Sequence, residues 1–92
     1  MMELLRAGQA GSVESNDIFI LIGPNEKGKG LEWHLESPVK SIYGDKIKEE
    51  IMEILKKYKI TDAIVQVTDR GALPFTVKAR TEAAILRAIK KD

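Results

Sequence analysis

Cysteine is absent from this sequence of 92 residues, and histidine occurs once. The lack of cysteine excludes disulfide bonds and thiolate-ligated metal sites. No apolar run approaches the length of a membrane span, and residues 1–9 lack the apolar core of a signal peptide. With 15 Lys and Arg against 14 Asp and Glu, the net charge of +1 does not indicate binding to nucleic acid or to an anionic membrane. We therefore expect a cytoplasmic protein.

Recognisable catalytic motifs are also missing. His34 stands at a solvent-facing position of a predicted strand, without a second histidine or a cysteine at a metal-ligand spacing. No G-x-S-x-G segment is present, although a carboxylate pair assembled by the fold stays open. Gly28-Lys29-Gly30 lies between two predicted strands, whereas a phosphate-binding loop would open a helix. We interpret it as a hairpin loop and expect no metal site.

What the sequence does contain is typical of one small globular domain, with 43% hydrophobic and 32% charged residues. Residues 1–16 are rich in small and polar types, bury little apolar area and are predicted to be flexible. Residues 17–92 carry the periodic patterns of a folded domain. We therefore divide the chain into a flexible N-terminal segment, 1–16, and an α+β domain, 17–92.

Three elements of the domain follow from hydrophobic periodicity. The continuous apolar run 18–22 and the alternating run 31–35 predict two strands, joined as a hairpin and ended by Pro38. The segment 45–58 predicts a helix, with Asp45 as its N-cap. Its apolar face consists of Ile47, Ile51, Ile54, Leu55 and Tyr58. Residues 60–68 predict a further strand.

The segment 73–79 has two interpretations. Its alternation of apolar and polar residues favours a fourth strand, followed by a short helix over 81–91. Alternatively, Pro74 is the first residue of a long helix that ends near Lys90. The favoured order is β-β-α-β-β-α, an α+β fold with an antiparallel sheet and two helices on one face. The alternative order is β-β-α-β-α.

One hydroxyl group lies in an unusual context. Ser15 belongs to the small, acidic segment 13–17, immediately before the first predicted strand. Ser15 or Asn16 can simply turn the chain into that strand. A serine on a flexible segment is also accessible to a modifying enzyme, and a group attached there can move between partners.

Several segments resemble a known family. Ala10-Gly11-Ser12-Val13-Glu14-Ser15-Asn16-Asp17 is similar to the A-G-T-x-E-S-G-D segment of the gamma subunit of citrate lyase, its acyl carrier protein. Ile42-Tyr43-Gly44-Asp45-x-Ile47 resembles the family's F-G-D-x-I. Asp69-x-Gly71-Ala72-Leu73 and Ala79-Arg80-x-Glu82-Ala83 continue the likeness, in order and spacing, from about residue 7 to residue 89.

The resemblance implies a site and a covalent cofactor. The serine of E-S-G-D, which is Ser15 by position, would carry 2'-(5''-phosphoribosyl)-3'-dephospho-CoA through a phosphodiester. Ser12 matches the family's threonine and not its modified serine. Asn16 replaces the family's glycine, and because both residues tolerate positive φ, we expect the local turn to survive.

The resemblance also implies a function and partners. The chain would be a non-catalytic carrier of acetyl and citryl thioesters, serving a citrate lyase alpha subunit (acyl transferase) and beta subunit (citryl-carrier lyase). A prosthetic-group transferase would attach the arm. The carrier subunit of malonate decarboxylase and a small interaction domain without a prosthetic group remain alternatives. Phosphopantetheine carriers fit less well, because their D-S-L serine opens a helix, whereas Ser15 precedes a strand.

Overall fold

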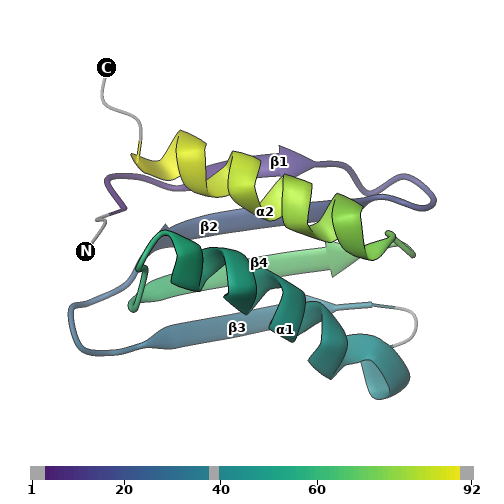
Figure 1. The fold of residues 1–92 in the computed structure, drawn as a ribbon, viewed down its shortest axis with the longest axis horizontal. Helices are drawn as coiled ribbons and strands as arrows, with labels where there is room; N and C mark the ends of the chain where they lie inside the picture. Colours follow the sequence, from purple (N-terminus) through teal and green to yellow (C-terminus); the bar gives the residue numbers. More distant parts are fainter. Residues whose placement is uncertain (1–3, 38–39, 90–92) are drawn as a thin grey trace.

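A computed structural model describes residues 4–37 and 40–89. Two helices lie on one face of a four-stranded sheet, so the α+β class predicted from the sequence is confirmed (Figure 1). The elements in chain order are β1 (Gly8–Gly11), β2 (Ile18–Pro24), β3 (Leu31–Glu36), α1 (Lys40–Lys57), β4 (Ala63–Asp69) and α2 (Pro74–Ile89). Neither helix in the described part of the chain is long and apolar enough to cross a membrane.

The sheet is mixed, which corrects the expectation of an all-antiparallel sheet. Its strand order is β1-β2-β4-β3, with β2 antiparallel to both β1 and β4. The predicted hairpin between 18–22 and 31–35 is wrong, because β3 pairs with β4 and runs parallel to it. Helix α1 connects β3 to β4, as a parallel pair requires a crossover connection. The predicted end of the strand at Pro38 lies outside the described residues.

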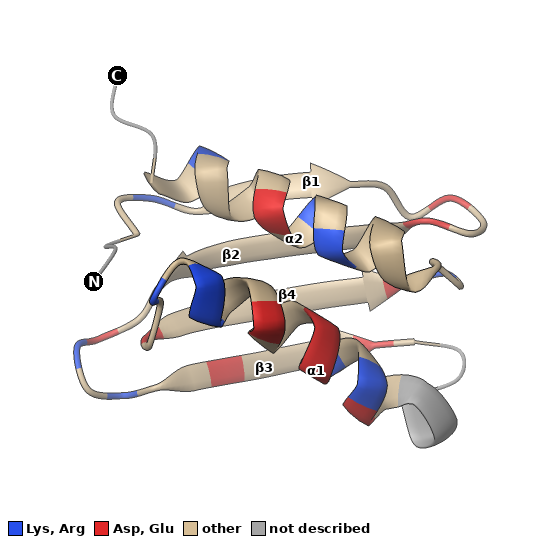
Figure 2. Cartoon of the chain, in the orientation of Figure 1, with Lys and Arg blue, Asp and Glu red and all other residues tan. Residues whose placement is uncertain are grey.

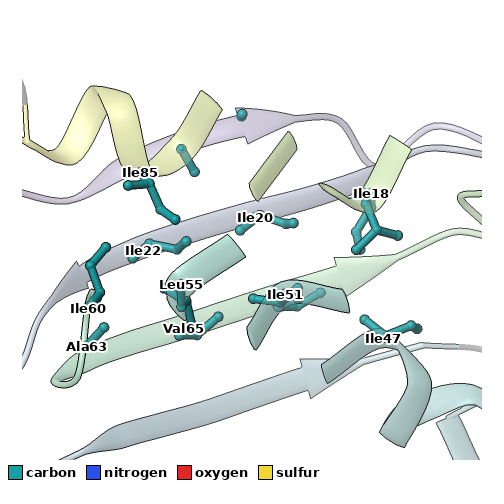
Figure 3. Packing of buried hydrophobic residues seen from close by; sticks show 14 residues of the cluster. Ile18, Ile20, Ile22, Ile47, Ile51, Leu55, Ile60, Ala63, Val65 and Ile85 are labelled. Carbon is teal, nitrogen blue, oxygen red and sulfur yellow. The ribbon is translucent and has the colours of Figure 1, made fainter. Parts of the chain in front are cut away.

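The core lies between the sheet and the two helices (Figure 3). Register places alternate residues of β2 opposite those of β4, such as Ile20 against Val67 and Ile22 against Val65, so their side chains share one face. Helix α1 covers this face with apolar residues at helical spacing, as predicted, and α2 supplies the rest. The largest fully buried side chains are Ile18, Ile20, Ile22, Ile51, Leu55, Ile85, Val65, Val67, Val77 and Thr81.

Helix α1 begins earlier than the sequence pattern indicates. Asp45 was expected as the N-cap, but α1 starts at Lys40 and Asp45 lies inside it, exposed. The predicted apolar face is confirmed, since Ile51 and Leu55 are almost completely buried. Charged residues of both signs lie on its outward side, with acidic residues in the middle of the helix and basic residues on either side of them (Figure 2). An amphipathic helix of this kind gains its stability from packing one face on the sheet.

The favoured strand over 73–79 is wrong, and the alternative of a helix beginning at Pro74 is confirmed. Leu73 and Phe75, which the strand interpretation treated as inward-facing, are 59% and 70% exposed. The buried residues of α2 instead follow helical spacing: Val77, Thr81, Ala84, Ile85 and Ala88. The buried Thr81 hydroxyl donates a 2.7 Å hydrogen bond to the Val77 carbonyl, which satisfies it. Residues 90–92 lie outside the described part.

Strand β1 lies within the segment that we expected to be flexible. Gly8 and Ala10 are buried against α2, which approaches so closely that a side chain at Gly8 would overlap the Ala84 carbonyl oxygen. The chain before β1 is also tied to this helix, because the Leu5 amide donates a 2.9 Å hydrogen bond to the Ala88 carbonyl. Small residues therefore form a packed strand here because they allow the strand and helix backbones to meet.

Candidate functional site

Ser15 belongs to the loop between β1 and β2. This loop lies at the end of the domain where α2 begins (Figure 1). The Asp17 amide donates a 3.1 Å hydrogen bond to the Glu14 carbonyl, so Ser15 and Asn16 are the central residues of a β-turn. Asn16 has φ 66°, the positive φ expected at the position where the resembling family has glycine. Ser15 is exposed, and its hydroxyl forms no hydrogen bond with the residues that the structure describes.

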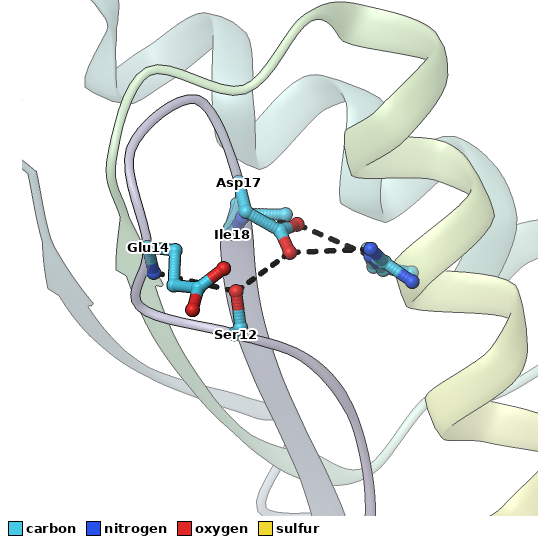
Figure 4. Close-up of polar contacts among 5 residues, drawn as sticks. Ser12, Glu14, Asp17 and Ile18 are labelled. Atoms are coloured by element: carbon cyan, nitrogen blue, oxygen red, sulfur yellow. Dashed lines mark hydrogen bonds and ion pairs between the residues drawn. The ribbon is translucent and has the colours of Figure 1, made fainter.

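Ser12, the second hydroxyl of the loop, has a different environment. Its Oγ donates a 2.8 Å hydrogen bond to Asp17 Oδ2 and accepts one from the Glu14 amide at 3.3 Å (Figure 4). Ser12 is half-buried by these contacts. The two serines therefore divide between two roles: Ser12 holds the loop together, and Ser15 presents a hydroxyl to solvent.

The Asp17 carboxylate accepts four hydrogen bonds that hold the loop together. It accepts hydrogen bonds from the Ile18 amide at 2.7 Å and from Ser12. Arg80 on α2 adds two more, from Nε at 3.2 Å and Nη2 at 3.1 Å. The Ile18 amide, followed by Ser12 and Arg80, lowers the pKa of Asp17 to about 2, so the carboxylate is ionised at neutral pH. The turn that carries Ser15 is thus attached to α2 by a charge-assisted bond.

The loop between β4 and α2 supports the same turn from the other side. The Asn16 amide donates a 2.7 Å hydrogen bond to the Arg70 carbonyl, and the Arg70 amide donates one of 2.9 Å to the Asp17 carbonyl. Asp69 is buried and fixes this loop by accepting hydrogen bonds from the amides of Gly71 and Ala72, both at 3.1 Å. The Ser15 turn is therefore hydrogen-bonded to a loop that Asp69 holds in place.

Gly11 shapes the start of the loop. It has φ 90°, and a Cβ there would overlap the Ile18 carbonyl oxygen. That oxygen accepts the Ser12 amide at 3.2 Å, which closes the base of the loop. Glycine is the residue that permits both the backbone conformation and the close approach.

A hollow of about 480 Å³ opens beside the turn, between the first half of α1 and the β4–α2 loop. It is lined by Lys46, Ile47, Glu50, Asp69, Gly71, Ala72, Leu73 and Pro74. Burial raises the pKa of Glu50, and Lys46 opposes that effect. The segments around the turn also expose apolar side chains, with Val13 57% and Phe75 70% exposed. This end of the domain thus combines an accessible hydroxyl with apolar surface.

The other residues considered from the sequence lie elsewhere. His34 Nε2 is 2.7 Å from Glu32 Oε2 on the exposed side of β3. Gly28-Lys29-Gly30 lies in the loop between β2 and β3, which is not the hairpin loop that we expected because these two strands do not pair. The Gly30 amide donates to Asp62 Oδ1 at 2.7 Å. Asp62 has a lowered pKa because backbone amides of Gly30 and Gly28 donate to it. Within residues 4–37 and 40–89, no group of three His, Cys, Asp or Glu is placed to hold a metal ion.

Sequence reasoning did not assign the residues that hold the site. Arg80 and Glu82 belong to a segment noted only for its resemblance. Glu82 accepts hydrogen bonds from Tyr58 Oη at 2.6 Å and Lys57 Nζ at 2.8 Å, which join the end of α1 to α2. Arg80 and Asp17 both belong to segments that carry the resemblance, and their opposite charges could have indicated an ion pair. Only the fold shows that they are in contact.

Comparison with known proteins gives consistent results. The family described as "Malonate decarboxylase delta subunit (MdcD)", an acyl carrier protein family, matches residues 6–88. A citrate lyase acyl carrier protein from Latilactobacillus sakei subsp. sakei (strain 23K) is 42% identical over 91 residues, 99% of this chain and 88% of that protein. A citrate lyase acyl carrier protein from Lactobacillus helveticus (strain DPC 4571) is 47% identical over 87 residues, 95% of this chain and 88% of that protein.

A solved structure shares the fold. A chain in the crystal structure of a Pseudomonas malonate decarboxylase hetero-tetramer in complex with malonate aligns with a TM-score of 0.64 and 20% sequence identity. The alignment covers 91% of this chain and 84% of that one. At this identity the likeness concerns the fold alone.

Proposed function

The chain belongs to the citrate lyase acyl carrier protein family, and from that premise we propose that Ser15 is the covalent attachment point of its prosthetic group. Acyl carrier proteins act by holding an acyl group on such an arm. The observation that carries the assignment to Ser15 is the contrast between the two loop serines. Ser15 is exposed on the turn, whereas Ser12 is engaged with Asp17 and Glu14.

The proposed arm is 2'-(5''-phosphoribosyl)-3'-dephospho-CoA, joined through a phosphodiester to Ser15 Oγ. The residues present fit an arm of this size, because the Ser15 turn projects from one end of the domain and its hydroxyl is unobstructed. When bound, the arm supplies a thiol that carries acyl groups as thioesters, which exchange and cleave more readily than oxygen esters. The chain's own residues present the hydroxyl and hold the turn in position.

The partners that we propose are a citrate lyase alpha subunit, which transfers the acyl group, and a beta subunit, which cleaves citryl-carrier. A prosthetic-group transferase would load the chain, which we propose acts in the cytoplasm. The chain itself would be non-catalytic, raising the arm's effective concentration at each partner site by tethering. We also propose that segment 1–16 carries the attachment serine and that residues 17–92 form the carrier domain. Strand β1 of the segment pairs with β2 of the domain.

A malonate decarboxylase carrier is the second candidate, and two observations favour it. The family matched over residues 6–88 is described by that enzyme's delta subunit, and the aligned solved structure comes from that complex. The curated relatives at 42% and 47% identity favour citrate lyase. The loaded chain is first acetylated on its thiol and then given to the purified alpha subunit of each enzyme with citrate or malonate as the incoming acid. The rate at which acetate is released as the incoming acyl group takes its place on the thiol, compared side by side, distinguishes the candidates. Faster exchange with the malonate decarboxylase subunit would reassign the chain.

Mass spectrometry tests the attachment. The full chain is incubated with the cognate transferase and its activated arm donor, and its intact mass is measured. We expect a gain equal to the phosphoribosyl-dephospho-CoA group in the wild type and in Ser12→Ala, and no gain in Ser15→Ala. Ser12→Ala is the matched control because it removes the neighbouring hydroxyl. No gain in the wild type with a transferase active on another carrier, or a gain that persists in Ser15→Ala, contradicts the proposal.

A further inference from the structure

We propose that the hollow between α1 and the β4–α2 loop binds the pantetheine end of the arm carried by Ser15, an inference that rests on the proposed function. The occupant is therefore a covalently attached, mostly neutral chain of methylene and amide groups that ends in a thiol or thioester. Between visits to its partners, the arm would return to this site on its own domain.

Position is the first observation. The turn and the hollow share the β4–α2 loop, because Asn16 donates to the Arg70 carbonyl and the next residue, Gly71, lines the hollow. A Cβ at Gly71 would lie 3.6 Å from Asn16 Oδ1, which shows how closely the turn approaches the wall. An arm on Ser15, the neighbour of Asn16, begins beside this opening.

Chemistry is the second observation. The walls supply apolar groups from Ile47, Ala72, Leu73 and Pro74, which suit the methylenes and the dimethyl group of pantetheine. Lys46 and Glu50 add one charge of each sign and Asp69 adds a further negative charge, so the hollow does not favour a phosphate. The volume of about 480 Å³ falls within the range of cofactor sites, which are mostly apolar with a few polar groups.

The hollow is also formed before any ligand arrives. Asp69, the remaining charged residue of the lining, is occupied by the amides of Gly71 and Ala72 and by the Ser37 hydroxyl at 2.9 Å. Its carboxylate therefore fixes the wall. Leu73 is 59% exposed, so covering it removes apolar surface from water without rearrangement of the chain. Docking of a tethered group needs only a small favourable free energy, because the tether supplies a high effective concentration.

NMR of the ¹⁵N-labelled full chain, before and after loading, locates the arm. We expect amide shift changes at Ile47, Ala72 and Leu73 on α1 and the loop, as well as around Ser15. The second measurement is the rate at which iodoacetamide alkylates the arm's thiol. The variant Leu73→Glu places a carboxylate on the wall, and Leu86→Glu is its matched control, because Leu86 is 47% exposed near the other end of α2.

Alkylation in loaded Leu73→Glu is expected to be about threefold faster than in the wild type, which corresponds to an arm docked about two thirds of the time. Leu86→Glu should match the wild type, and the unloaded variants should keep the wild-type spectrum. Loading confirmed by mass, with shifts confined to the Ser15 turn and equal alkylation rates, overturns docking and leaves the carrier function intact. No mass gain in the wild type overturns the carrier function, and docking falls with it.

Discussion

Replacing Gly11 with alanine tests the geometry that positions the Ser15 loop, and Gly28→Ala is its matched control. Both glycines have similar positive φ, 90° and 85°. A Cβ at Gly28 would meet nothing within 4 Å, whereas one at Gly11 would overlap the Ile18 carbonyl oxygen. In both variants, alanine must adopt a positive φ in the folded state, and the unfolded chain has a smaller conformational entropy. They differ only in the steric contact.

The magnitudes follow from these two contributions. A left-handed conformation costs a non-glycine residue about 1–2 kcal/mol, which the reduced entropy of the unfolded chain offsets by about 0.4–1 kcal/mol. Gly28→Ala should thus lose about 1 kcal/mol of the free energy of unfolding. Gly11→Ala must also shift β1 away from β2, which adds about 1–3 kcal/mol in the manner of overpacking.

Urea denaturation followed by circular dichroism measures both variants. We expect Gly11→Ala to be less stable than Gly28→Ala and to be loaded more slowly by the transferase, because the Ser12 amide loses its bond to the Ile18 carbonyl. Equal stability of the two variants would refute the view that the base of the loop is closed by backbone contact at Gly11.

Three further predictions concern the Asp17 carboxylate, the buried core and the exposed side chain of Leu73. The pKa of the Asp17 carboxyl, followed by NMR, should be about 2, and Arg80→Ala should raise it. A wild-type pKa near 3.8, the ordinary value of an aspartate, would contradict the four hydrogen bonds. Because the folded-state pKa is lowered, the stability from Asp17 is complete above the unfolded-state value and is lost as pH falls through about 2. Ile51→Ala, in the fully buried core, should cost about 2–5 kcal/mol of the free energy of unfolding by urea titration. Ile64→Ala should lower the free energy of unfolding by less, because Ile64 is only half-buried. Equal losses in the two variants would contradict the assignment of Ile51 to the core and of Ile64 to its edge. Leu73→Glu should change the free energy of unfolding by less than about 0.5 kcal/mol, because its side chain is exposed; a larger loss would show that Leu73 belongs to the core.

Local periodicity was sufficient for elements with a clear apolar face. The helical spacing of Ile47, Ile51 and Leu55 predicts α1, and the alternation in 31–35 predicts a strand whose inward residues pack on the core. Pairing between strands was beyond such reasoning. Residues 18–22 and 31–35 are close in sequence, but β4 enters between them in the sheet. Only the complete set of tertiary contacts decides which strands meet.

One error had a specific physical cause. At 73–79, alternation of Leu73, Phe75 and Val77 imitates a strand, but only Val77 is buried, and its stripe continues at Thr81, Ala84 and Ile85. Residues 8–11, within the segment predicted to be flexible, form β1, and their small size lets Gly8 approach α2. The site, too, was only partly predictable from the sequence. The sequence singled out Ser15 through resemblance, but the support from Arg80 required the fold, because 63 residues separate it from Asp17.

The proposed function depends on attachment of the arm to Ser15 Oγ. Fragmentation mass spectrometry of the peptide that contains residues 12–17, taken from the chain purified with its native partner subunits, tests it most directly. We expect the phosphoribosyl-dephospho-CoA mass on Ser15, with Ser12 unmodified. The same mass on Ser12, or an unmodified peptide from a complex with full lyase activity, would contradict it.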